Sequence, residues 1–128
     1  MPAARSGQHS LHDAAARGLT DEVARLIRDG ADVAGTDESG RTALHAACQQ
    51  GEVQAAKVLL DADASVEARD AFGNTPLWRA VFGQEAEPEL VRLLLDAGAD
   101  PDAKNGSGRS PRDMAITFDK PGVRELFA

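Results

Sequence analysis

The chain has 128 residues, of which 42% are hydrophobic and 27% are charged, enough for one globular domain with one core. Asp and Glu outnumber Lys and Arg by 21 to 14, and the formal net charge of −7 and the lack of a basic run exclude a nucleic-acid or anionic-membrane binder. Because there is no long apolar stretch, no secretory pattern in "MPAARSGQHS" and only one cysteine, we expect a cytoplasmic protein without a membrane span.

Two short helices are predicted after a flexible N-terminal segment at residues 1–8. The first lies in "SLHDAAARG" at positions 10–18. The second carries Val23, Leu26 and Ile27, whose i, i+3, i+4 spacing is the apolar stripe of an amphipathic helix. Gly30 follows this stripe and suits the left-handed residue that often ends a helix. This pair cannot bury its own stripe and needs a neighbour.

The same pattern returns along the chain. "ALHAACQQG" at 43–51 and "PLWRAVFGQ" at 76–84 repeat the first stretch, and their second residues, like Leu11, are spaced by 33. Thr42 and Thr75 are predicted N-caps, with Pro76 at the first helical position. The second stripe recurs 33 residues on, then after a further 35 and a further 32, as the triplets Ala56, Leu59, Leu60; Val91, Leu94, Leu95; and Val123, Leu126, Phe127. A repeated two-helix unit predicts a stacked solenoid.

Two departures from the period have local consequences. The interval of 35 places two extra residues between Ala80 and Val91, so "GQEAEPE" is predicted to be a lengthened acidic loop. Its carboxylates could invite a cation, but we favour Glu87 as a helix cap with Pro88 at the first helical position. Asp63 occupies the place of Gly30 and is expected to destabilise its turn.

Polar loops with Asp or Asn before Gly separate the units. These are "TDESGRT", "RDAFGNT" and "KNGSGRS". The stretch "GSGRS" at 106–110 could be taken for a phosphate-binding loop. It lacks the following Lys and a preceding strand, and it is in register with the other turns, so we interpret it as a turn.

With "RTALHAACQQGEVQAAKVLL", "GNTPLW" and "LVRLLLDAGADPDAK", the chain resembles the ankyrin repeat family, in particular small single-domain bacterial members. The resemblance covers about residues 9–128 and implies an all-α solenoid of four repeats, near 9–36, 37–69, 70–104 and 105–128. In the last repeat Arg112 and Asp113 replace the Leu-His pair, which suits a polar end cap. The positions held by Ala34, Glu67 and Asp102 lack the family's asparagine, so modification there is not expected.

His45 and Cys48 could share a helical face as a metal site or a nucleophile–base pair. The only further soft ligands are His9 and His12, one repeat away. By the resemblance, His12 and His45 instead make structural hydrogen bonds to the backbone between repeats. Cys48 stands where Ala15 and Val81 stand in other units, which indicates a small buried residue. We therefore expect no metal, no cofactor and no catalytic residue.

The resemblance places partner binding on the loop tips and on the exposed face of the first helices. Phe72 lies at a loop tip outside the apolar stripes, which favours a role as an anchor. Trp78 and Phe82 could either reach the same surface or pack beneath the lengthened loop. The candidate binding residues are Glu38, Ser39, Arg41, Gln49, Gln50, Phe72, Asn74, Trp78, Phe82 and Arg109.

The expected function is non-enzymatic protein binding by a chain that is a monomer when free. The net charge of −7 favours a partner with a basic surface. By analogy with the family, one role is an immunity protein that neutralises a toxin; the alternative is an adaptor or regulator of a cytoplasmic enzyme. An enzyme using His45 or the 85–89 loop is a third possibility, supported only by proximity.

Overall fold

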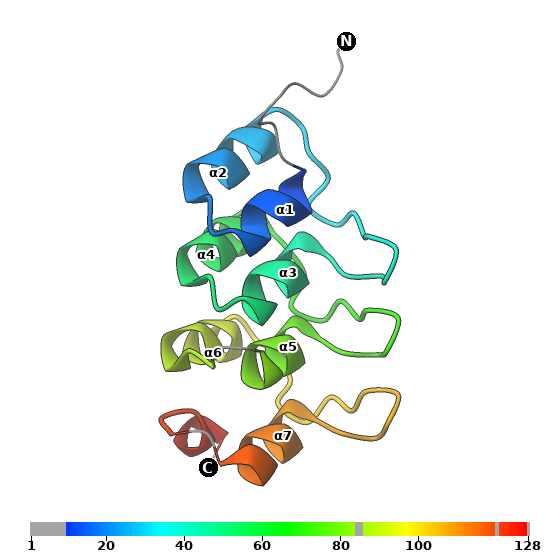
Figure 1. Ribbon diagram of the computed structural model, residues 1–128, viewed down its shortest axis with the longest axis vertical. Coiled ribbons are helices and arrows are strands. Elements are labelled where there is room, and N and C mark those ends of the chain that lie inside the picture. The colour runs from blue at the N-terminus through cyan, green and yellow to red at the C-terminus, as the bar shows by residue number, and fades with distance from the viewer. Residues whose placement is uncertain (1–9, 84–85, 120, 128) are drawn as a thin grey trace.

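A computed structural model describes residues 10–83, 86–119 and 121–127, and the N-terminal segment 1–8 lies outside the described residues. Successive helix pairs stack along one axis, and a loop projects from the same side of each layer (Figure 1). Within the described ranges no β-strand is present. The predicted all-α solenoid is therefore confirmed.

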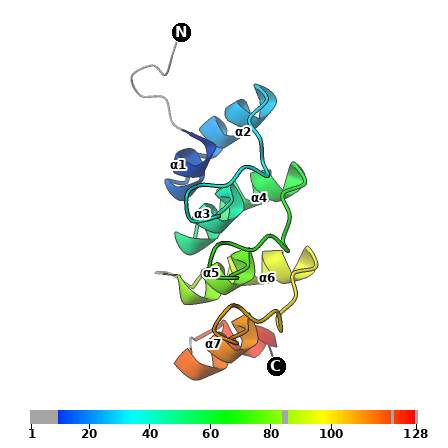
Figure 2. The ribbon, with the colours of Figure 1, turned by 90° about the vertical axis from the view of Figure 1, so that its right-hand side faces the viewer.

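The helices form two parallel columns. The first helices of the layers contact one another in order, as do the second helices. In Figure 2 the side that carries the loops faces the viewer, and the loops lie in front of the two columns. The first column contains α1 (Leu11–Ala16), α3 (Ala43–Gln49), α5 (Pro76–Phe82) and α7 (Pro111–Phe118); the second contains α2 (Thr20–Arg28), α4 (Val53–Asp61), α6 (Pro88–Asp96) and the 3-10 helix η1 (Arg124–Phe127).

Leucines and small residues fill the space between the columns. Leu44, Leu59, Leu77 and Leu94 have no exposed surface, and the alanines among them let neighbouring helices approach closely. The core is continuous from α1 to η1. Each stripe is thus buried against the layers above and below, as the periodicity predicts.

The first helices begin at side-chain caps. Thr42 accepts a hydrogen bond from the N–H of His45, and Thr75 accepts one from the N–H of Trp78, with Pro76 at the first helical position. These predicted caps are confirmed. Glu87 does precede Pro88 at the start of α6, but its side chain makes no capping hydrogen bond, so that part of the prediction is wrong.

The connection between α5 and α6 is longer than its equivalents. It runs from 83 to 87, whereas α3 and α4 are joined by residues 50–52. The two extra residues predicted there are therefore in this loop. Residues 84 and 85 lie outside the described ranges, and with them the first part of the acidic stretch for which a cation was considered.

The fourth layer differs from the others. The sequence predicts a second helix carrying Val123, Leu126 and Phe127, but the structure has only the four-residue 3-10 helix η1. Pro121 lacks a backbone N–H and Gly122 has a φ of +78°, so an α-helix cannot run through this segment. Val123 and Phe127 are nonetheless buried against the layer before.

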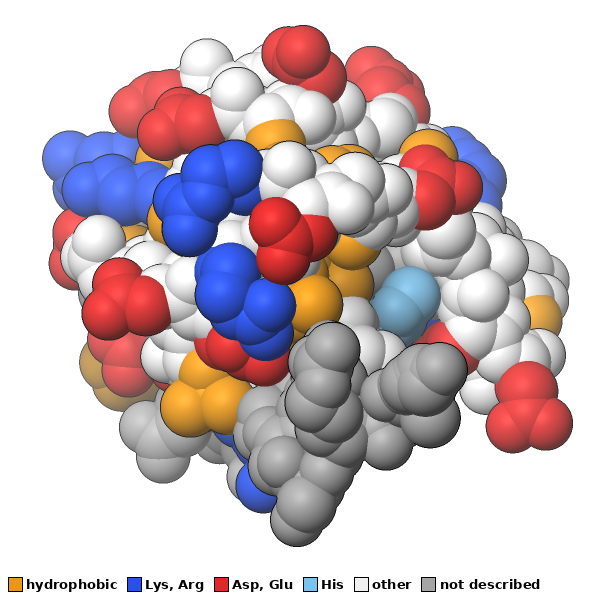
Figure 3. Space-filling model, turned by 90° about the horizontal axis from the view of Figure 1, so that it is seen from above, with side chains coloured by type: hydrophobic (Ala, Val, Ile, Leu, Met, Phe, Trp, Pro, Cys, Tyr) orange, Lys and Arg blue, Asp and Glu red, His pale blue; other side chains and the backbone are white. Residues whose placement is uncertain are grey.

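The N-terminal end of the stack is polar. Seen from above, acidic and basic side chains interleave over the described surface, with small hydrophobic patches between them (Figure 3). On α2, Arg25 pairs with Glu22 at 2.7 Å and with Asp29 at 3.2 Å. Charged side chains thus cover much of the described part of this end face.

Asp63 adopts the left-handed conformation that its position in the repeat demands. Its φ is +69°, whereas Gly30 and Gly98 occupy the same place with φ of +101° and +98°. An L side chain is strained in this region, although less so for Asp than for most residues. The turn after α4 therefore holds local strain.

Asp63→Gly is expected to raise the free energy of unfolding by up to about 1 kcal/mol, because glycine adopts a positive φ without strain. Chemical denaturation of both proteins measures the difference. Asp61→Gly is the matched control: the same change at the last residue of α4, which has a helical conformation, should not stabilise the chain and should cost at most a few tenths of a kcal/mol. A clear loss of stability in Asp63→Gly would mean that its carboxylate makes a stabilising contact.

Candidate functional site

Each projecting loop is built around one carboxylate or amide oxygen. At Asp70, Oδ1 accepts hydrogen bonds from the N–H groups of Phe72 and Asn74, both at 2.9 Å. Asp37 and Asn105 do the same in the loops before and after. Such side-chain-to-backbone bonds fix a turn, which is why Asp or Asn is needed at this position.

Neighbouring loops are also joined through their backbones. The N–H of Ala71 donates to the carbonyl of Ser39 at 2.8 Å, and the N–H of Gly106 donates to that of Phe72 at 2.9 Å. Gly73 has a φ of +80°, and a Cβ there would lie 2.8 Å from the nitrogen of Gly106. The backbone of Phe72 is thus fixed on both sides, and its ring, 64% exposed, projects from a rigid tip.

Histidines link the first helices to the next loop. Nε2 of His12 lies 2.7 Å from the carbonyl oxygen of Arg41, and Nε2 of His45 lies 2.8 Å from that of Asn74. The structural hydrogen bonds implied for both histidines are confirmed. In the next layer Trp78 occupies the same place, and its Nε1–H has no hydrogen-bond partner among the described residues.

The bonds around His45 require a neutral ring. Nδ1 accepts from the N–H of Thr42 at 3.1 Å, so the ring proton is on Nε2, which donates to Asn74. Burial lowers the pKa of His45, and the bond to Asn74 opposes that shift without reversing it; Asp70 favours the charged ring, whereas Arg79 and Arg41 disfavour it. If Nδ1 were protonated, its N–H would face the N–H of Thr42, and the hydrogen bond between them would be lost.

Stability is expected to fall as the pH drops below about 6.5, because the unfolded chain then binds a proton that folded His45 resists. The loss begins near the unfolded pKa and continues down toward the lower folded pKa. Equilibrium unfolding in urea at several pH values between about 5 and 8 measures it. In His45→Gln the dependence should be weaker; an unchanged dependence would assign it to other groups.

Cys48 lies in the core rather than at a reactive surface. It has no exposed area, and burial raises the pKa of its thiol above the ordinary range. In the described part of the chain, no group of three His, Cys, Asp or Glu side chains is arranged to hold a metal ion. His45 and Cys48 are thus placed as structural residues, and His9 lies outside the described ranges.

A groove of about 1160 Å³ opens between the third and fourth layers. Phe72 at the loop tip, Trp78 and Phe82 on α5, and Met114 and Phe118 on α7 form its apolar wall. The ring centroids of Trp78 and Phe82 are 4.8 Å apart, and those of Phe82 and Phe118 are 5.7 Å apart. We call this the aromatic groove.

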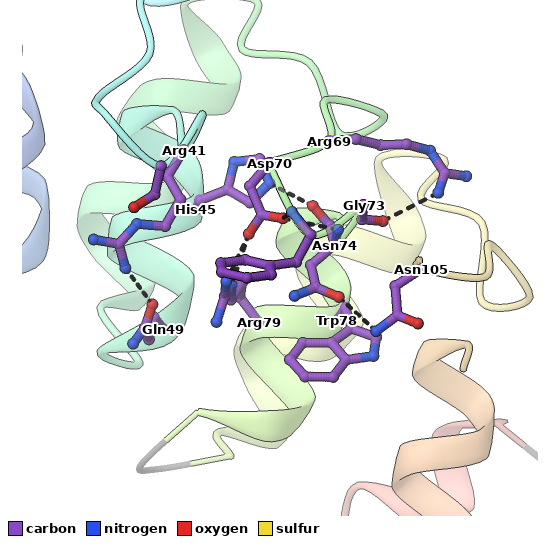
Figure 4. A network of polar contacts seen from close by, with 12 residues as sticks. Arg41, His45, Gln49, Arg69, Asp70, Gly73, Asn74, Trp78, Arg79 and Asn105 are labelled. Carbon is purple, nitrogen blue, oxygen red and sulfur yellow. Dashed lines mark hydrogen bonds and ion pairs between the residues drawn. The ribbon is translucent and has the colours of Figure 1, made fainter. Parts of the chain in front are cut away.

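Polar residues also line the aromatic groove. Oδ2 of Asp70 accepts two bonds from Arg79, the shorter at 2.7 Å, and Asn105 donates to Oδ1 of Asn74 (Figure 4). Burial alone would raise the pKa of Asp70, but the bonds from Arg79 and the loop N–H groups outweigh it, and the pKa lies below its ordinary value. Asp70 is thus a buried anion that holds Arg79 in place.

The structure separates the predicted binding residues into two groups. Phe82 and Arg109 are exposed and line the aromatic groove with Phe72, whereas Asn74 and Trp78 line it but are almost fully buried. Trp78 is therefore largely buried, but it still lines the groove; packing beneath the lengthened loop is not tested, because residues 84 and 85 lie outside the described ranges. The remainder lie one layer earlier: Glu38 and Gln50 are exposed, and Ser39, Arg41 and Gln49 are half-buried, with Arg41 donating to Gln49 at 2.8 Å.

Sequence reasoning missed Arg69, Arg79, Met114 and Phe118 in the groove. A signal for Phe118 existed. It shares its repeat position with Gln50 and Gly83, so a large apolar side chain there is out of pattern, and it is 51% exposed. The arginines had no such signal, because isolated basic residues on a repeat are common on any exposed face.

The chain matches the family model described as "Ankyrin repeats (3 copies)" over residues 11–105. It is 46% identical over 72 residues to "Potassium channel KOR1" of Oryza sativa subsp. japonica, a match that covers 56% of this chain and 8% of that protein. Human "Ankyrin repeat domain-containing protein 63" is 40% identical over 76 residues, a match that covers 54% of this chain and 20% of that protein. Mouse "Protein phosphatase 1 regulatory subunit 12A" is 40% identical over 72 residues, which cover 56% of this chain and 7% of that protein. The chain thus matches at most a fifth of these relatives' lengths.

None of the described helices is long and apolar enough to cross a membrane.

Proposed function

This chain belongs to the ankyrin repeat family, and from that premise we propose that it is a non-enzymatic module that binds a protein partner through its loops and first helices. Ankyrin repeats mediate protein–protein interaction. The observation that carries the proposal here is the aromatic groove, where Phe72, Phe82 and Phe118 are each about half exposed or more. Exposed aromatics on a rigid concave surface are typical anchors of protein interfaces.

The backbone around the groove is held rigidly before any partner binds. The loop backbones are fixed by Asp70 and Asn105 and by their mutual hydrogen bonds, so ordering them on binding needs little further entropy loss. Among the charged side chains that line it, Asp70 and Arg79 form an ion pair with each other. We propose four repeats near the predicted bounds, a monomeric free state and a cytoplasmic location.

Two roles are compatible with this function. An immunity protein that neutralises a toxin with a basic surface is supported by analogy with the family and by the net charge of −7. An adaptor or regulator of an enzyme is supported by the similarity to a protein named as a phosphatase regulatory subunit. We favour the second, because the groove itself is lined by arginines and does not complement a basic surface.

A photo-crosslinking amino acid at Ser107, in the wall of the groove, is expected to form covalent conjugates with one partner protein in cells that express the chain. The same amino acid at Gln54, exposed on α4, should form none with that partner. Mass spectrometry of the conjugates identifies it. Adding Phe72→Ala to the Ser107 protein should lower the yield by about tenfold or more, since truncating an anchor speeds dissociation.

The contrary pattern has a clear meaning. If the partner is captured from Gln54 and not from Ser107, binding uses the second helices and the proposed face is wrong. If Phe72→Ala leaves the yield from Ser107 unchanged, the groove contacts the partner without Phe72 as an anchor.

A further inference from the structure

The charges of the chain are sorted between its two sides. The second helices and the turns after them, at 20–34, 52–67 and 87–102, hold thirteen of the 21 acidic residues but only four Lys or Arg. The aromatic groove is the reverse, with Arg69, Arg79 and Arg109 against the single carboxylate of Asp70. The acidic excess of the chain therefore lies on the second helices and the turns after them, and not in the groove.

Two of the groove arginines have no carboxylate partner among the described residues. The guanidinium of Arg69 donates only to the backbone carbonyls of Gly73 and Lys104, and Arg109 is exposed and forms no ion pair. Asp70 cannot neutralise them, because its two oxygens already accept four hydrogen bonds. Asp113 interacts with Arg109 electrostatically but forms no ion pair with it, so the lining keeps an excess of positive charge, with three arginines and the one carboxylate of Asp70.

The groove also contains a buried hydrogen-bond donor, the Nε1–H of Trp78, that lacks an acceptor among the described residues. Trp78 lines the groove and is 8% exposed, and its Nε1–H is the one buried side-chain polar atom without a partner among the described residues. Buried N–H groups are rarely left unsatisfied. Four of the five aromatic residues of the chain also lie in this groove, while the fifth, Phe127, is in the core.

We infer that the aromatic groove binds a segment of the partner protein in which an acidic side chain stands beside an aromatic or large aliphatic one. This rests on the proposed protein-binding function and names the chemistry of its ligand. The apolar side chain would pack against Phe72, Phe82 and Phe118, of which the last two already lie side by side with ring centroids 5.7 Å apart. The carboxylate would pair with Arg109 and Arg69, whose planar guanidinium groups suit it.

A protein segment fits this groove better than a nucleic acid, although stacked bases and phosphates use similar groups. Affinity for single-stranded nucleic acid grows with the number of phosphates contacted, and here three arginines are set in a chain of net charge −7. A polyanion would be repelled by the rest of the molecule. One or two carboxylates on a short segment would not experience comparable repulsion.

Selection from a displayed library of short random peptides against the whole chain tests the inference. Enriched peptides should contain Asp or Glu next to Phe, Tyr, Trp or Leu. Fluorescence anisotropy with one synthetic enriched peptide should show Arg109→Glu weakening binding by about tenfold or more. Arg92→Glu, the same charge reversal on the exposed face of α6, should change it little. Replacing the peptide acid by Lys should restore binding to Arg109→Glu.

Three results would overturn the inference. The first is that the enriched peptides are basic. The second is that the same peptides are enriched equally when the Arg109→Glu protein is used for the selection. The third is that Arg109→Glu and Arg92→Glu change the affinity for the synthetic peptide equally. An oligothymidylate that binds more tightly than the peptide and depends on Arg109 would instead assign the groove to nucleic acid. Crosslinking of a partner from Ser107 is independent of these outcomes, so it shows whether the ligand chemistry alone or the binding function itself is wrong.

Discussion

Leu59→Ala is expected to lower the free energy of unfolding by about 2–5 kcal/mol, the range for truncating a buried leucine that leaves a cavity. Leu59 has no exposed surface, and it lies on α4, which packs against both α2 and α6. In a solenoid a change in an inner layer weakens two interfaces at once, so unfolding should remain cooperative but begin at lower denaturant. Leu94→Ala should behave alike.

Leu19→Ala is the matched control for this prediction. Leu19 is 37% exposed and precedes α2, so the same truncation should change stability by less than about 1 kcal/mol. Urea denaturation followed by circular dichroism measures all three variants. If Leu59→Ala were no more destabilising than Leu19→Ala, the interfaces between layers would not determine the stability of the stack.

Asp70→Ala is expected to destabilise the chain by about 3–5 kcal/mol, the range for breaking a buried ion pair. The side chain of Asp70 is fully covered, and its removal leaves Arg79 without its counter-ion and two loop N–H groups without their acceptor. Since the pKa of Asp70 is lowered in the folded state, its contribution is present above its unfolded pKa of about 3.8 and is lost as the pH falls toward the folded value.

Asp102→Ala gives the control, because Asp102 pairs with Arg112 at the same 2.7 Å distance but is largely exposed. Exposed pairs contribute little, so its stability should be close to that of the parent chain. Asp70→Asn separates the two roles of the side chain: Asn105 already holds its loop with an amide, so the loop should survive while Arg79 loses its anion. Equal stabilities of Asp70→Ala and Asp102→Ala in thermal unfolding would contradict the burial argument.

Much of the fold followed from the sequence because its causes are local. The 33-residue period, the caps at Thr42 and Thr75 and the left-handed position of Asp63 depend on residues within one unit or on its immediate neighbour. Two local expectations were wrong: Glu87 does not cap α6 with its side chain, and the last unit ends in a 3-10 helix. In the second case Pro121 and Gly122 outweigh an apolar stripe that was itself correctly phased.

The groove needed the tertiary structure. Trp78 and Phe118 are 40 residues apart, and only the stacking of α5 on α7 places them with Phe82 in one wall. The sequence predicted Phe72 and Phe82 as binding residues, but it left open whether Trp78 was exposed, because a ring at that position can either replace the histidine or leave the core. Its unpartnered nitrogen is a property of the packing.

Charge shows the same division most clearly. The sequence by itself determined the total of −7 and the order of the repeats, since both are sums or spacings along the chain. Only the tertiary structure decided which face each charge occupies, placing most carboxylates on the second helices together with the turns after them, and Arg69, Arg79 and Arg109 around the aromatic rings. Electrostatic attraction in a groove depends on distance and burial rather than on the total, because charges more than about 10 Å away are screened by salt.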